Sequence, residues 1–257
     1  MDIKVTSANI RFQNEQDGAN DWPHRRILMS NILMDFRPNF LGTQEGREPQ
    51  LRNLCELLPG YVLIDSHRDW IAERMYPCIF IRPDVTERIN SGDIWLSKTP
   101  NVPASKSFDS AFPRLCTWLH GKDKLSNKEF LFVVTHLDHK KEETRIEQAK
   151  VLSQEILKIN PCLPLILIGD FNTNPQSKVH EILTKDLNVK DHWLEKKIPE
   201  ETSHHKFTGS NPAGSRIDWM LVSDKFYCEE VYLDKTNRDG IYPSDHFPLM
   251  GKFIHIG

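Results

Sequence analysis

The sequence lacks the features that mark several large classes of protein. It has no hydrophobic run near the roughly 20 residues that a membrane-spanning helix needs. Its first residues pass into a strand-like pattern without the apolar stretch of a signal peptide, so we expect a cytoplasmic protein without stable membrane association. No repeat or low-complexity tract interrupts the chain. Its 257 residues suit a single domain over residues 1–257.

Cysteine is scarce, and charge of one sign does not dominate. The five cysteines include no Cys-x-x-Cys pair, so neither a disulfide framework nor a thiolate metal site is expected. Lys and Arg total 33 against 36 Asp and Glu, a formal net charge of −3. Proteins that coat long nucleic acid usually carry a strong basic footprint, and this balance argues against one. Nothing in the sequence indicates an obligate protein partner.

Short apolar runs alternate with helix-like segments along the chain. Residues 130–134 and 165–168 are apolar on both faces, which is typical of strands covered on both sides. Such strands with intervening helices indicate either two stacked sheets with helices outside or one doubly wound sheet, and periodicity does not choose between them. The other predicted elements are helices at 23–36, 50–58 and 142–159 and strands at 3–10, 40–43, 61–64, 78–81, 117–120, 217–222 and 249–254.

Polar side chains occur where the predicted strands end. Asn9 ends the first strand, Glu45 follows the second, and His136 and Asp170 follow the two strongly apolar strands, with Asn172 two residues further on. Each has a plain alternative, because Asp and Asn form turns and a histidine at a strand end is often structural. Their recurrence favours a functional site, since ligands gather at the carboxyl ends of strands. Carboxylate and amide oxygens suit a hard cation.

Acidic and imidazole groups also occur together in the last part of the chain. Asp245 and His246 are adjacent, although a single pair of this kind is more often a surface feature. Asp218 lies within an apolar strand, and a buried carboxylate needs a partner such as a histidine. A zinc site is disfavoured, because no His-Glu-x-x-His helix is present and the other candidates are oxygen donors.

Taken in order, these segments resemble the endonuclease/exonuclease/phosphatase superfamily, which includes DNase I-like nucleases, deadenylases, inositol-polyphosphate phosphatases and bacterial sphingomyelinases. A bacterial branch of metal-dependent hydrolases is the most similar. Two segments depart from that branch, since the one before residues 78–81 lacks an expected acidic residue and a substrate-side loop has an extra His and Lys. The matching segments are Ser7-Ala8-Asn9-Ile10-Arg11, Asp17-Gly18-Ala19-Asn20-Asp21-Trp22, Gln44-Glu45, Pro113-Arg114, Thr135-His136-Leu137-Asp138-His139, Gly169-Asp170-Phe171-Asn172, Arg216-Ile217-Asp218 and Tyr242-Pro243-Ser244-Asp245-His246; the departures are Arg74-Met75-Tyr76-Pro77-Cys78 and Ser203-His204-His205-Lys206-Phe207.

The resemblance implies an α/β fold, a four-layer sandwich of two stacked mixed β-sheets flanked by helices (DNase I-like). It also implies Mg²⁺ or Mn²⁺ as the cofactor. In this scheme Asp170, oriented by Asn172, is the base for water, and Asp218 holds His246, which contacts the phosphate. Arg114 is either a phosphate contact or a structural ion-pair partner. The implied sets are the metal ligands Glu45, Asn9 and Asp245, the catalytic residues His136, Asp170, Asn172, Asp218 and His246, and the substrate contacts Arg11, Arg114, His139 and His205.

The function implied is a divalent-metal-dependent phosphoesterase that cleaves phosphodiester bonds by in-line attack of water. Short nucleic acid or a nucleotide is the first choice of substrate. A phosphomonoesterase, or a hydrolase of phospholipid headgroups or inositol phosphates, is the alternative at the same site. A catalytically silent binding domain of the same fold is the alternative from a different class.

Overall fold

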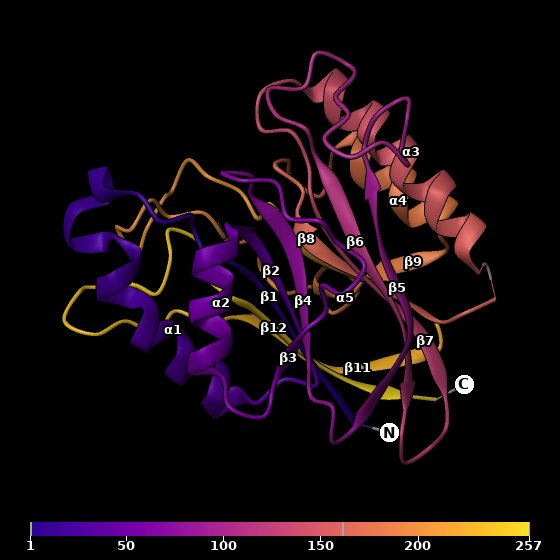
Figure 1. Cartoon of the computed structure of the whole chain (residues 1–257), viewed down its shortest axis with the longest axis horizontal. Coiled ribbons are helices and arrows are strands. Elements are labelled where there is room, and N and C mark those ends of the chain that lie inside the picture. Colours follow the sequence, from indigo (N-terminus) through magenta and orange to yellow (C-terminus); the bar gives the residue numbers. More distant parts are fainter. Residues whose placement is uncertain (1, 161, 257) are drawn as a thin grey trace.

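Two mixed β-sheets, each of six strands, form the centre of the protein. The computed structural model describes residues 2–160 and 162–256 (Figure 1). The first sheet has the order β11-β12-β1-β2-β4-β3, and the second has the order β5-β6-β7-β8-β10-β9. The strands of the first sheet are β1 (Asp2–Asn9), β2 (Phe40–Gly46), β3 (Val62–Leu63), β4 (Tyr76–Ile81), β11 (Phe226–Leu233) and β12 (Leu249–His255). Those of the second are β5 (Thr86–Trp95), β6 (Leu115–Asp123), β7 (Glu129–His136), β8 (Leu165–Asp170), β9 (Val189–Asp191) and β10 (Asp218–Ser223).

Helices cover the outer face of each sheet. The first sheet is covered by α1 (Trp22–Phe36) and α2 (Glu48–Leu57), and the second by α3 (Glu142–Ile159) and α4 (Lys178–Asp186) (Figure 1). Two short helices, η1 (Glu15–Asn20) and α5 (His192–Glu195), lie in connections. The predicted four-layer sandwich is confirmed, and the alternative of one doubly wound sheet is wrong. Within the described ranges, no helix is long and apolar enough to cross a membrane.

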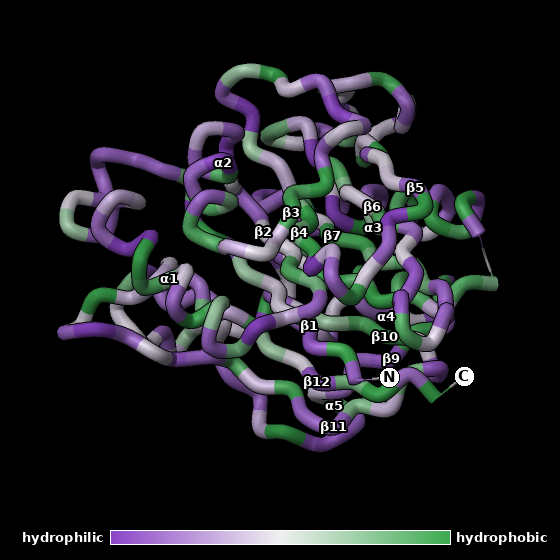
Figure 2. The backbone as a smooth tube through the Cα atoms, turned by 60° about the horizontal axis from the view of Figure 1, so that its bottom comes forward, coloured by the Kyte–Doolittle hydropathy of each residue, from purple (hydrophilic) through white to green (hydrophobic). Residues whose placement is uncertain are grey.

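The strands that were predicted to be covered on both faces supply both sides of the core. Ile166 and Ile168 of β8 pack between the two sheets, whereas Leu165 and Leu167 face α3 and α4. This follows from the alternation of side chains along a strand. Figure 2 shows hydrophobic residues concentrated in the strands and hydrophilic ones in the surrounding loops.

The two sheets approach one another closely at Gly42 of β2. A Cβ atom at this position would lie 2.5 Å from Ile168 Cδ1 and 2.6 Å from Val134 Cγ2, which both belong to the other sheet. Since neither side chain has room to move within a packed core, only glycine fits. The close approach brings the ends of β2, β7 and β8 together.

The connections place the ends of the central strands at one edge of the sandwich. Each sheet contains one parallel pair, β1–β2 in the first and β7–β8 in the second. β12 is antiparallel to β1, and β10 is antiparallel to β8. The last residues of the four parallel strands therefore meet the first residues of β10 and β12. All the strand-end residues identified in the sequence lie at this edge.

The elements that the sequence analysis missed lie mainly at the sheet margins. β5 and β11 are the outermost strands of their sheets, and much of β5 is exposed and charged. Edge strands carry polar residues that protect their open backbone groups, which weakens the alternating pattern used to recognise strands. The predicted helices at 23–36, 50–58 and 142–159 are confirmed to within two residues at each end.

Candidate active site

Asn9 joins the two sheets at the centre of this edge. Its Nδ2 lies 3.1 Å from Glu45 Oε1 and 3.1 Å from Asp170 Oδ2, while its Oδ1 accepts a hydrogen bond of 3.0 Å from the Arg11 backbone N–H. The amide thus donates to two carboxylates from different sheets, at a position that a cation could occupy. To act as a metal ligand, Asn9 would have to turn its amide oxygen toward them.

Glu45 is aimed at the site by an unusual backbone conformation. Its φ is 68°, in the left-handed region, and the pairing of β2 with β4 shifts register between Thr43 and Gly46. Such a conformation costs free energy in a residue other than glycine and is often found at functional sites. The Phe12 backbone N–H donates to Glu45 Oε2 at 3.3 Å, which leaves Oε1 facing Asn9.

Asp218 and His246 form a buried acid–histidine pair. Asp218 Oδ2 lies 2.8 Å from His246 Nδ1, and the Ser203 hydroxyl oxygen accepts from the Asp218 backbone N–H at 3.1 Å. Burial alone would lower the pKa of His246, but the Asp218 carboxylate raises it to about 10. The ring is therefore protonated, and its Nε2 faces Asp170 Oδ2 at 3.9 Å.

Asp170 lies between two imidazoles that differ in protonation, because the pKa of His246 is raised and that of His136 is lowered. His136 Nε2 is 3.4 Å from Asp170 Oδ2, and burial together with the charge of Arg114 keeps the pKa of His136 well below its usual value. Burial and the Asp218 carboxylate raise the pKa of Asp170 to about 7. Asn172 orients Asp170 through its backbone N–H, which donates to Oδ1 at 2.9 Å, whereas its side chain donates to the Leu137 carbonyl.

The side chains that could hold a metal form neighbouring groups. One consists of Glu45, His136 and Asp170, and another of His204, Asp245 and His246, each with ligand atoms within 4.8 Å of one another. Glu45 and Asp245, which the sequence analysis both named as metal ligands, therefore lie in different groups. The first group adds two carboxylates to the Asn9 amide, which is a donor set that suits a hard cation. A third combination, of Asp170, Asp218 and His246, is occupied by the acid–histidine hydrogen bond.

His205 does not reach the site, so its predicted substrate contact is corrected. The side chain is fully buried, stacks on Phe247 at 3.9 Å between ring centroids and accepts a hydrogen bond from the Gly209 backbone N–H. Its neighbour His204 stacks on His246 at 4.6 Å and lies 3.7 Å from Asp245 Oδ2. The sequence showed that the loop contains an extra histidine, but it did not show which of the two side chains points toward the site.

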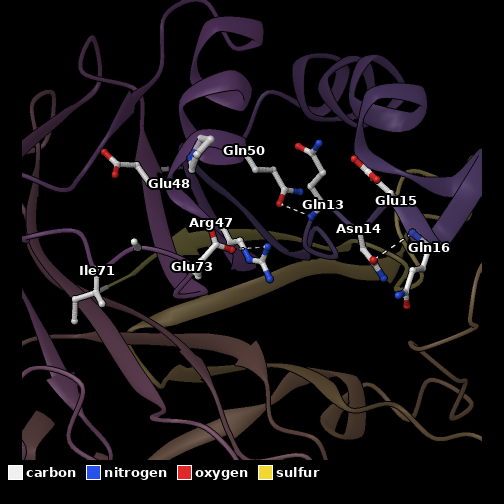
Figure 3. Close-up of a pocket in the computed structure, with 11 residues that line it drawn as sticks. Gln13, Asn14, Glu15, Gln16, Arg47, Glu48, Gln50, Ile71 and Glu73 are labelled. Atoms are coloured by element: carbon white, nitrogen blue, oxygen red, sulfur yellow. Dashed lines mark hydrogen bonds and ion pairs between the residues drawn. The ribbon is translucent and has the colours of Figure 1, made fainter.

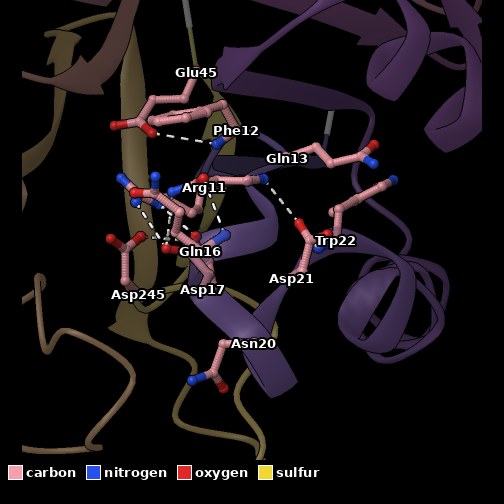
Figure 4. A network of polar contacts seen from close by, with 12 residues as sticks. Arg11, Phe12, Gln13, Gln16, Asp17, Asn20, Asp21, Trp22, Glu45 and Asp245 are labelled. Carbon is pink, nitrogen blue, oxygen red and sulfur yellow. Dashed lines mark hydrogen bonds and ion pairs between the residues drawn. The ribbon is translucent and has the colours of Figure 1, made fainter.

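Arg11 is already paired with a carboxylate. Its Nε and Nη2 donate to the two oxygens of Asp17 at 2.9 and 3.0 Å. Figure 4 shows its guanidinium between the carboxylates of Glu45 and Asp245. The hydrogen bonds to Asp17, followed by the charges of Asp245 and Glu45, raise the pKa of Arg11. A phosphate would thus compete with Asp17 for Arg11. Asp17 belongs to one of the recognised segments, but its role was not predicted.

Arg114 and His139 lie on the β7 side of the site. The Arg114 side chain is buried, and its Nη2 lies 3.3 Å from His139 Nδ1. In the parts of the chain that the structure describes, its Nε has no hydrogen-bond partner and its guanidinium has no ion pair. Arg114 therefore does not act as the structural ion-pair partner that was the alternative. His139 is exposed and stacks on Phe112.

Arg25, which the sequence analysis missed, holds the site loops together. Its buried guanidinium on α1 donates to the backbone carbonyls of Ile10, Arg11, Asn20 and Pro243 at 2.5 to 2.9 Å. These bonds join the loop after β1 to the segment just before Asp245. This role could not be predicted from the sequence, because an arginine on a helix is usually exposed.

The chain resembles a known protein family over nearly its full length. The model of the Endonuclease/Exonuclease/phosphatase family matches residues 6–246. The chain belongs to this family. Its members are hydrolases that act on phosphate esters.

Solved structures agree with this assignment. A family protein from Bacteroides thetaiotaomicron is 30% identical, with 98% of this chain and 97% of that chain covered and a TM-score of 0.89. A mannosyl-6-phosphatase from the same organism is also 30% identical, with 98% and 99% covered and a TM-score of 0.88. The human Nocturnin catalytic domain, at 22% identity, 98% and 93% coverage and a TM-score of 0.75, shares the fold. A search of the curated proteins finds no match.

Proposed function

We propose that this protein hydrolyses phosphate esters of small molecules with Mg²⁺ or Mn²⁺ as cofactor. One arrangement carries the proposal. The Asn9 amide joins the carboxylates of Glu45 and Asp170. Beside them lies the protonated His246, which Asp218 holds through a hydrogen bond. Cation, base and electrostatic donor are the parts that phosphoryl transfer requires. A silent binding domain would have no need to keep all of them, so this alternative is disfavoured.

The cation would be held by Glu45, with Asn9 completing the set after its amide has turned and Asp170 beside it on the other sheet. The two carboxylates are close enough to share one amide N–H₂ group, which indicates room for one shared positive charge. When bound, such a cation neutralises charge on the phosphoryl and leaving oxygens. Asp245, with His204 beside it, is the candidate for a second position.

The chain's own side chains have separate tasks in this proposal. Asp170, whose Oδ1 accepts a hydrogen bond from the Asn172 backbone N–H, takes a proton from the attacking water. The protonated His246 stabilises negative charge on the phosphoryl group, and the neutral His136 donates a hydrogen bond to it. Arg11, Arg114 and His139 bind the substrate around this centre.

The shape of the site supports a small substrate. A pocket of about 230 Å³ opens beside Glu45 and His136, and the net charge of the chain is −3. Both features favour a small ester over long nucleic acid. The similarity to a mannosyl-6-phosphatase supports a monoester as the first candidate. The phosphodiester expected from the sequence is the second, supported by a wider neighbouring pocket of about 610 Å³ that could receive another ester group (Figure 3).

A panel of phosphate esters tests this proposal. Sugar phosphates, nucleoside monophosphates, dinucleotides, short oligonucleotides and a p-nitrophenyl diester are incubated with the protein and Mg²⁺, Mn²⁺ or EDTA. We expect hydrolysis of at least one small ester, with loss in EDTA and recovery on adding metal. Full activity in the metal-stripped protein would contradict the cofactor assignment. Cleavage of long nucleic acid alone would contradict the small substrate.

A further inference from the structure

The pocket beside Glu45 is lined by an unusual number of arginines. Arg47, Arg74 and Arg114 all contribute to its wall, and in each of them the Nε atom is buried without a hydrogen-bond partner among the described residues. A buried N–H donor without a partner is costly, and the side chains of Arg47 and Arg74 are otherwise partly exposed, so a ligand can reach them. Three such donors around one cavity indicate a binding site for a group that the chain itself does not contain.

The acidic residues of the pocket do not balance these three charges. Arg47 pairs with Glu73 at 3.0 Å, but the Glu73 side chain is 82% exposed, so water weakens the pair. Figure 3 shows this pair at the border with the wider pocket, which Arg47 and Glu73 also line. The side chain of Arg74 has no hydrogen bond or ion pair among residues 2–160 and 162–256. Glu45, the other acid in the wall, is assigned to the cation.

The rest of the wall is largely apolar and aromatic. Phe12, Met75, Phe112 and Leu115 line the pocket together with the arginines. A guanidinium binds phosphate through two parallel hydrogen bonds, and an apolar wall accommodates the ring or chain that carries the phosphate. The volume of about 230 Å³ is below the roughly 300–1,000 Å³ of sites that enclose a whole drug-sized ligand, so the pocket suits one part of a substrate.

We propose that this arginine pocket binds a second, uncleaved phosphate group, so that the substrate is a small molecule with two phosphates. The inference rests on the proposed function, which places the cleaved phosphate at Asn9, Asp170 and His246. The wall of the pocket includes Glu45 and His136 but neither Asp170 nor His246, so it lies to one side of that centre. A substrate that spans both positions is held at two points.

Binding of inorganic phosphate to the metal-free protein tests the pocket without relying on catalysis. In EDTA the centre presents Glu45 and Asp170 to an anion, so phosphate is expected to bind at the arginines. Calorimetry should detect this binding in the unaltered protein, and Arg74→Gln and Arg47→Gln should each weaken it about tenfold or more. Arg88→Gln, which changes the charge equally on exposed β5 outside this pocket, should leave it unchanged. Melting curves confirm that all variants are folded.

A comparison of substrates completes the test. Sugar bisphosphates and their matching monophosphates are assayed with Mg²⁺, and we expect kcat/KM to be about tenfold or more higher for the bisphosphate. The ratio should fall toward one in Arg74→Gln and persist in Arg88→Gln. Equal kcat/KM values in the unaltered protein, or phosphate binding that Arg74→Gln leaves intact, would overturn the assignment. Hydrolysis of esters without phosphate binding in EDTA overturns the pocket but leaves the proposed function standing, whereas binding without any hydrolysis contradicts the function and supports the pocket.

Discussion

The parallel pair β1–β2 ends in Asn9 and Glu45, whereas the parallel pair β7–β8 of the other sheet ends in His136 and Asp170. Both halves use the same strand arrangement, but they differ in how their charges are balanced. On the β7–β8 side, Asp170 faces a charged imidazole that is supplied by the chain, since Asp218 keeps His246 protonated.

The β1–β2 side depends instead on groups outside the chain. Glu45 has only an amide and a backbone N–H as its hydrogen-bond donors among the described residues, and the pocket next to it contains arginines without adequate partners. The β7–β8 side is therefore preset by the protein, and the β1–β2 side is completed by ligands. Substitutions in the first should change rate, and substitutions in the second should change rate and ligand binding together.

The largest effect on activity is expected for Glu45→Gln, on the β1–β2 side of the site, which depends on ligands. Loss of the carboxylate should weaken Mg²⁺ binding and lower kcat on the order of a thousandfold, the upper range for one lost electrostatic contact. Metal titration by calorimetry and steady-state kinetics measure the two effects. Normal Mg²⁺ affinity in this variant would remove Glu45 from the metal site and undermine the comparison.

Asp218→Asn should affect only the β7–β8 side of the site, where the chain itself supplies the charged imidazole. It removes the charge that keeps His246 protonated but retains the shape, so turnover should fall roughly a hundredfold while Mg²⁺ affinity stays nearly unchanged. The same calorimetry and kinetics serve, with melting temperature as a check on folding. If Asp218 only supports the strand, the variant will melt earlier and its folded fraction will turn over normally.

Arg25→Met should destabilise the loops around the site, because Arg25 joins the loop after β1 to the segment before Asp245. Several backbone carbonyls would lose a buried donor, and the free energy of unfolding should fall by at least about 2 kcal/mol. Urea unfolding measures the loss. Arg26→Met is the matched control, since Arg26 is the next residue on α1 and within the described ranges its side chain hydrogen-bonds only to Asn53. Equal losses in the two variants would show that Arg25 has no special role.

The smallest effect concerns Asp93, a largely buried carboxylate on β5. Burial would raise its pKa, but hydrogen bonds from Arg68 and His67 lower the pKa of Asp93 to about 2. The unfolded value is near 3.9. Because the folded pKa is the lower one, Asp93 stabilises the fold by about 2 kcal/mol above pH 4, and this is lost as the pH falls toward 2.

Urea unfolding of the unaltered protein and of Asp93→Asn between pH 7 and pH 2.5 measures this contribution. The difference in unfolding free energy between the two proteins should narrow as the pH falls below 4. A difference that stays constant with pH would contradict the pairing. Turnover at neutral pH is a useful second readout, because a change there would extend the comparison beyond the strand-end residues.

Many of the strands and helices could be predicted from the order of residues in the sequence. The doubly apolar runs at 130–134 and 165–168 became the central strands β7 and β8, and the predicted helices cover the sheets. Edge strands such as β5 were missed because their charged residues hide the alternation. The choice between two stacked sheets and one doubly wound sheet came from the resemblance, because periodicity describes which faces are apolar and not which strand is the neighbour.

Residue order is enough to predict which chemical groups lie at the strand ends, because alternation and chain direction place Asn9, Glu45, His136 and Asp170 at one edge. The packing of the folded chain is needed to learn that His204 and not His205 faces this edge, that Asp17 pairs with Arg11, and that the Nε atoms of the pocket arginines have no hydrogen-bond partner among the described residues. Loops have no period, so the direction of each loop side chain depends on contacts with residues far away in the chain. Those contacts exist only once the two sheets have packed.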